Sequence, residues 1–159
     1  GEDKRNAEWV DGISGYLPDS LIIRYEHWNE EGGSIDYPKE LPKLETLVSE
    51  EGEIQRVVAK SAGTLLALNG FQRGILKPNH YYLLGFPEVW ARERKLLRSS
   101  FGLKEILVPI TFIQQKDDPQ CSSEVLNTML KPSELIEIDG NDHWYGNYKE
   151  IAEIINHNN

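Results

Sequence analysis

Short runs of β-branched, aromatic and leucine residues alternate along this chain with longer segments whose apolar residues recur at helical spacing. Such alternation is typical of α/β folds, in which right-handed crossovers join parallel strands. Most of the expected strands are apolar on both faces, which indicates a sheet covered by helices on both sides. We therefore expect an α/β three-layer sandwich whose mostly parallel sheet has about five or six strands. The expected strands span residues 21–25, 56–59, 81–84, 110–113 and 135–138.

Helical patterns occupy the segments between these strands, where crossover connections are needed. Pro42 falls in the first turn of one such segment, as is typical of a helix start. Gly52 and Gly70 each follow the last residues of a helical segment, as is typical of a helix end. The 159 residues suit one domain, spanning 1–159, with little chain left for a cap over a site. The expected helices span residues 3–16, 40–50, 62–69, 88–98, 122–130 and 146–156.

Charge and cysteine content narrow the class of protein. The net charge of -9 repels phosphate backbones and anionic lipid, so we expect no nucleic-acid partner and no membrane partner. Cys121 is the single cysteine, which excludes an internal disulfide and fits a reducing, cytoplasmic location. The apolar runs are too short to span a bilayer, and the first residues show no signal-peptide pattern. We expect a monomer or a weak homodimer.

The most informative stretch is residues 57–64, where a strand ends, a serine follows and a helix begins at once. Ala59 and Gly63 flank Ser61 at minus two and plus two, where bulky side chains would clash with the strand and the helix. The turn lifts the Ser61 hydroxyl clear of the sheet and leaves the first backbone N–H groups of the helix unpaired, so Ala62 N–H is a candidate oxyanion donor. The alternative is that Ser61 is an ordinary helix N-cap.

A carboxylate and a histidine follow two later strands. Asp117 and Asp118 come after residues 110–113, and His143 comes after residues 135–138. In open α/β sheets the ligand site lies beyond the carboxyl ends of the strands, which is where all these groups fall. A serine hydroxyl becomes a useful nucleophile when an imidazole takes its proton, and a buried carboxylate orients that imidazole.

These segments together resemble the α/β-hydrolase superfamily, and within it the small, nearly capless intracellular serine hydrolases and esterases. The resemblance runs from about residue 3 to residue 155. The A-x-S-x-G at Ser61 is similar to the G-x-S-x-G elbow of that family, with a small alanine in place of the first glycine. The family's acid directly precedes a proline, which favours Asp118 over Asp117, and small and polar residues precede its histidine, as they precede His143.

The resemblance implies a function. Ser61 would be the nucleophile, His143 the general base and Asp118 the acid that orients it, acting on a small ester, thioester or related acyl substrate through an acyl-serine intermediate. It implies no cofactor and no metal. In agreement, His80 and His157 lack metal-ligand spacing, and no phosphate-binding glycine loop follows a strand.

One part of the family pattern is absent from the sequence. The family has a strand ending in His-Gly before the first helix, and the loop after it donates the second oxyanion N–H. Here the chain begins where that loop belongs, so Gly1 is taken as its remnant and as the second donor. Either the strand has been removed, which we favour, or the sheet closes without it, or another chain supplies it. Without that strand the protein is expected to be a catalytically inactive binding or interaction module, which is the alternative function.

Several further side chains fall at the expected active-site edge and are candidates for lining a substrate pocket. For each there is a simpler interpretation: loop packing, a solvated lysine, or packing in the core. These candidates are His27, Trp28, Lys60, Phe86 and Trp144.

Overall fold

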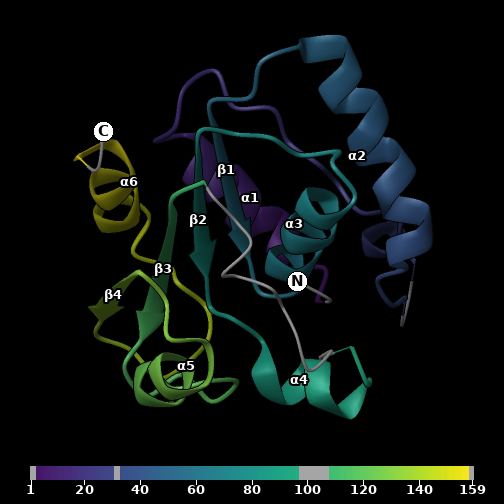
Figure 1. Cartoon of the computed structure of the whole chain (residues 1–159). Coiled ribbons are helices and arrows are strands. Elements are labelled where there is room, and N and C mark those ends of the chain that lie inside the picture. The colour runs from purple at the N-terminus through teal and green to yellow at the C-terminus, as the bar shows by residue number, and fades with distance from the viewer. Residues whose placement is uncertain (1–2, 31–32, 97–107, 158–159) are drawn as a thin grey trace.

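The computed structural model describes residues 3–30, 33–96 and 108–157 and contains one parallel sheet covered by helices on both faces (Figure 1). Four strands pair in the order β1-β2-β3-β4, all parallel, so that each joins the next through a helical crossover. The strands are β1 (Arg56–Lys60), β2 (His80–Leu84), β3 (Ile110–Gln115) and β4 (Glu134–Ile138). The helices are α1 (Asn6–Ser14), η1 (Glu26–Asn29), α2 (Tyr37–Glu51), α3 (Ala62–Gln72), α4 (Glu88–Glu93), α5 (Ser123–Leu130) and α6 (Tyr148–His157).

The strand register brings the carboxyl ends of the strands to one edge. Lys60 at the end of β1 pairs with Leu84 at the end of β2, and Gln115 at the end of β3 pairs with Ile138 at the end of β4. Hydrogen bonds carry this alignment into the following turns, because Ser61 N donates to Leu84 O at 2.9 Å. The segments after β1, β3 and β4 therefore begin at the same edge of the sheet.

Alternate residues of the central strands fill two separate cores. Tyr81, Leu83 and Phe112 face a core formed with α2, α3, α4 and α5. Tyr82 and Leu84 face a second core, formed with α1 and α6. Every residue of β3 is buried, as expected for a strand with helices on both faces.

The helices occupy the predicted segments with shifted ends. Helix α2 begins at Tyr37, earlier than expected, since Pro38 is favourable in the first turn, and it continues through Pro42. The helix expected over 88–98 ends at Glu93, and the last part of the predicted range lies outside the described residues. None of the described helices is long and apolar enough to span a bilayer.

The expected strand over 21–25 is wrong, and the described sheet has four strands instead of the expected five or six. Residues 21–25 form no strand and pair with none of the described strands, and β1 forms one edge of the described sheet. An apolar, β-branched run satisfies its backbone groups as a strand only when a neighbouring strand is available. The run ends at Tyr25, which packs into the core beside η1.

Candidate active site

Ser61 occupies a strained turn between β1 and α3. Its φ of 54° and ψ of -129° lie in a region of backbone conformation that residues other than glycine rarely adopt. The tight space around the turn explains its small neighbours: a Cβ atom added to Gly63 would lie 3.2 Å from Tyr25 Oη and 3.9 Å from Ala59 Cβ. The Ser61 side chain makes no N-cap hydrogen bond, so the ordinary capping role does not account for it. Ala62 is the first residue of α3, where a backbone N–H has no acceptor within the helix.

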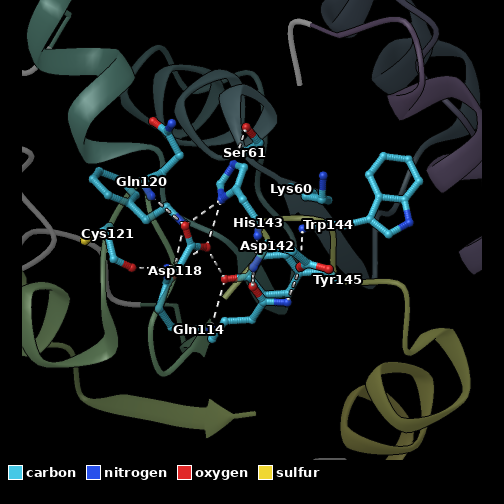
Figure 2. Close-up of polar contacts among 12 residues, drawn as sticks. Lys60, Ser61, Gln114, Asp118, Gln120, Cys121, Asp142, His143, Trp144 and Tyr145 are labelled. Atoms are coloured by element: carbon cyan, nitrogen blue, oxygen red, sulfur yellow. Dashed lines mark hydrogen bonds and ion pairs between the residues drawn. The ribbon is translucent and has the colours of Figure 1, made fainter. Parts of the chain in front are cut away.

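His143 lies between the hydroxyl of Ser61 and the carboxylate of Asp118 (Figure 2). The distance from His143 Nε2 to Ser61 Oγ is 2.9 Å, and Nδ1 lies 2.8 Å from Asp118 Oδ2. A carboxylate only accepts hydrogen bonds, so Nδ1 carries the proton of a neutral imidazole and Nε2 is left to accept from the hydroxyl. This geometry is suited to removal of the Ser61 proton.

Asp118 is held in place by several donors. Its side chain is fully buried, and it accepts hydrogen bonds from Gln120 N at 2.8 Å and from Tyr145 Oη at 2.7 Å. Gln114 Nε2 contributes a longer contact of 3.2 Å. Asp117, the other candidate, is exposed, and the carboxylate oxygens at 2.9 and 2.8 Å from His143 Nδ1 both belong to Asp118. The geometry thus favours Asp118 as the partner of the histidine.

Gln115 fixes the loop that carries His143. Its Oε1 accepts from the backbone N–H groups of Asp142 and His143 at 3.1 and 3.0 Å, and its Nε2 donates to Asp142 Oδ1 at 2.9 Å. Gly140 makes room for this clamp, since a Cβ atom there would lie 2.5 Å from Gln115 Cδ, and its φ of +145° disfavours other residues. The side chain of Gln115 thereby sets the position of the imidazole.

Sequence reasoning missed these supporting residues. Gln114 and Gln115 are two buried amides at the end of an otherwise apolar strand, and buried polar side chains need specific partners. That signal was present, but Gln115 accepts from backbone N–H groups 27 and 28 residues further along the chain, and Gln114 accepts from Phe86 N, 28 residues earlier. Nothing in the local sequence of Tyr145 shows that its hydroxyl reaches Asp118.

A cleft of about 200 Å³ opens at Ser61 and His143. Two of the candidate pocket residues, Lys60 and Trp144, line it. The expectation fails for the three other candidates: Phe86 is fully buried in the core, and His27 and Trp28 pack with Tyr25 away from the cleft. The apolar surface of these rings is better removed from water than exposed in a cleft. The remaining lining residues are Asp3, Arg5, Asn6, Trp90, Gln120 and Asp142.

Gly1, the expected second oxyanion donor, lies outside the described residues. Cys121 is buried, and its burial raises the pKa of the thiol to about 12, so the thiolate needed for nucleophilic chemistry is not formed near neutral pH. Within the described ranges no group of three or more histidine, cysteine or acidic residues is placed to hold a metal ion.

Several solved structures have a fold similar to that of this chain. A lipase-esterase related protein from Clostridium acetobutylicum matches with a TM-score of 0.68 at 14% identity, covering 99% of this chain and 90% of that one. A protein described as a YdeN-like hydrolase from Pectobacterium atrosepticum matches with a TM-score of 0.65 at 18% identity, covering 91% and 80%. A protein described as a hydrolase of the alpha/beta superfamily from Xanthomonas campestris matches with a TM-score of 0.56 at 14% identity, covering 93% and 89%.

No protein-family model and no curated protein matches the sequence. Over most of its length the chain has a fold similar to that of these solved hydrolase and esterase structures. At these sequence identities the likeness extends to the fold alone.

Proposed function

We propose that this protein is a serine hydrolase that cleaves a small ester, thioester or related acyl substrate through an acyl-serine intermediate. The observation that carries the proposal is the hydrogen-bonded series from Ser61 Oγ through both nitrogens of His143 to Asp118. These groups follow three different strands, and packing alone does not require them to meet. The same series at a strained strand-to-helix turn is the arrangement that acyl transfer needs.

The reaction divides into two similar steps. Ser61 Oγ attacks the carbonyl carbon while His143 Nε2 takes the hydroxyl proton, and the protonated imidazole then gives that proton to the departing alcohol or thiol. The acyl group is left as an ester of Ser61. Water, deprotonated by His143, then attacks this ester, and the protonated imidazole gives the proton to Ser61 Oγ as the ester bond breaks and the acid leaves. Asp118 keeps the imidazole in the correct tautomer and stabilises its protonated form.

The negative oxygen of the tetrahedral intermediate needs hydrogen-bond donors. Ala62 N–H is the donor we propose, because it directly follows Ser61 and begins α3. Removing one such donor from a serine hydrolase typically lowers kcat by about 10²- to 10³-fold. We propose Gly1 N–H as the second donor, in line with the sequence prediction.

The test replaces Ser61 with alanine and follows hydrolysis of p-nitrophenyl acetate. We expect Ser61→Ala to lower turnover by about a thousandfold or more, because no other group at the turn can form the acyl-enzyme. Ser49→Ala is the matched control, since it removes an exposed hydroxyl from α2, and it should retain parental turnover. Circular dichroism and the urea midpoint show whether both variants fold.

Two results would count against the proposal. Equal turnover in folded Ser61→Ala and in the parent would show that the hydrolysis, if any, arises elsewhere. A folded parent that hydrolyses no acyl ester or thioester in a panel of short and medium chains, and that no fluorophosphonate labels, would favour a binding or interaction module.

A further inference from the structure

Lys60 is a buried cation in the candidate cleft, and the proposed reaction leaves it without a role. Lys60 is the last residue of β1 and directly precedes Ser61. Only 6% of its surface is exposed, and it lines the cleft together with Ser61 and His143. Burying an ammonium group is costly unless it is paired and hydrogen-bonded. A lysine at the surface would satisfy the fold equally well, so the burial needs a separate explanation.

The immediate surroundings of the ammonium group stabilise its charge only in part. Lys60 Nζ donates one hydrogen bond, of 2.9 Å, to Asn6 Oδ1. It lies 5.5 Å from the ring centre of Trp9 and 5.1 Å from that of Trp144, within the range of cation–π attraction. Among the described residues no carboxylate lies within ion-pair distance of it. An ammonium has three donors, so donors remain for a further partner.

The acidic residues nearest to Lys60 are engaged by other groups. Asp3 pairs with Arg5 through its Oδ2 at 2.8 Å. Asp142 accepts from the Gln115 side chain, and Asp118 accepts from the residues described above. These carboxylates attract Lys60 from a distance and Arg5 repels it, but none of them is its hydrogen-bond partner. The site thus holds a positive charge whose counter-ion is not a described residue.

We infer that Lys60 binds an anionic group of the substrate, so that the cleft selects acyl substrates that carry a carboxylate. This inference rests on the proposed hydrolase function and assigns its substrate class. Lys60 is buried and Nζ lies beside two tryptophan rings, and low exposure to water strengthens its attraction to a carboxylate that enters there. The chain as a whole carries a charge of -9 and repels anions, so local recognition requires such a cation.

The protonation state of the lysine agrees with this role. Burial lowers the pKa of Lys60 to about 8, while attraction to Asp118, Asp142 and Asp3 acts in the opposite direction. The side chain is therefore mostly charged at neutral pH. A carboxylate bound beside Nζ would favour the charged form further.

The test compares pairs of esters that differ in one charge. The first pair is the p-nitrophenyl monoester of adipic acid and the same ester with its free acid converted to a carboxamide. The second pair is the acetate ester of 4-hydroxybenzoate and that of 4-hydroxybenzamide, which moves the charge to the leaving group. We expect kcat/KM to favour the anionic member of at least one pair by about tenfold or more, the effect of one charged hydrogen bond.

Lys60→Met should reduce that ratio to near one, because it keeps the length of the side chain and removes the charge. Lys60→Gln serves if the methionine variant fails to fold, and Lys60→Arg should keep part of the preference. Lys116→Met is the matched control: it makes the same substitution at an exposed position after β3, outside the cleft, and should leave the ratio unchanged.

A binding measurement separates this inference from the proposed function. Calorimetric titration of adipate into Ser61→Ala protein should give binding that the added Lys60→Met change weakens by about tenfold or more. If esters are hydrolysed but neither anionic member is preferred, or if the preference survives in Lys60→Met, the inference is overturned while the hydrolase function stands. If no ester is hydrolysed but adipate binding depends on Lys60, the anion site stands and the hydrolase function fails.

Discussion

Tyr145→Phe removes a single oxygen atom that connects two parts of the candidate site. Tyr145 is buried, its hydroxyl donates to Asp118 Oδ2 at 2.7 Å, and it accepts from Gln115 N at 2.9 Å. Burial and the nearby Asp118 both raise the pKa of the phenol, so it remains a donor throughout the working range of pH. The phenyl ring of the variant fills the same space, which leaves the change in hydrogen bonding as its main effect.

The expected loss of stability follows from those two contacts. A hydrogen bond to a charged acceptor contributes about 1.5–3 kcal/mol, and a buried N–H left without an acceptor costs about 1–3 kcal/mol. Rearrangement of the surrounding groups recovers part of each loss, so we expect Tyr145→Phe to lower the free energy of unfolding by about 3 kcal/mol. For a domain of this size that corresponds to a fall in Tm of roughly 10 °C.

Urea unfolding measures this change, provided that the m-value stays constant. Tyr148→Phe is the matched control, because it removes a phenol oxygen from the same face of the sheet at a half-buried position. That oxygen makes no hydrogen bond to any of the described residues. It should change stability by less than about 0.5 kcal/mol. Because Asp118 also loses a positioning contact, ester turnover should fall by about tenfold. Equal midpoints for the two variants would refute the role assigned to Tyr145.

Three further predictions concern the same edge of the sheet. Ser61→Gly should be more stable than Ser61→Ala by about 1 kcal/mol in urea unfolding, because both variants lack the hydroxyl but only glycine readily adopts the positive φ. An alanine variant of equal or higher stability would argue against backbone strain at this turn. Cys121 should resist alkylation by iodoacetamide at pH 8 in the folded protein and react after unfolding, as its raised pKa requires; rapid labelling of the folded state, followed by mass spectrometry, would contradict the burial. The preference for anionic esters should decline as the pH rises through about 8, because Lys60 loses its charge above its pKa; a ratio of kcat/KM that is constant from pH 6 to 10 would contradict this assignment.

The features of the fold that depend only on residues close together in the sequence were predictable. The strand, serine and helix around Ser61 are encoded within eight residues, because a sharp turn demands small neighbours at 59 and 63. The rule that sites lie beyond the carboxyl ends of parallel strands then brought Asp118 and His143 to the same edge. That rule works here because the register of β1 to β4 aligns those ends.

The parts that depend on distant partners were not predictable. Residues 21–25 have the composition of a strand, but whether they pair depends on a neighbour elsewhere in the chain. Phe86 follows β2 as a pocket residue would, yet its ring packs against Phe112 in the core. The hydrogen bonds from Gln115 and Tyr145 join segments about 30 residues apart in sequence, and no local pattern carries that information.

The most direct measurement is the mass of the protein after treatment with a fluorophosphonate, with the modified peptide identified by fragmentation. The account predicts one adduct per chain, located on Ser61, and its loss in a folded His143→Ala variant, since the hydroxyl then has no base at 2.9 Å. An unmodified parent protein, an adduct at another residue, or labelling of equal rate in His143→Ala would contradict the account.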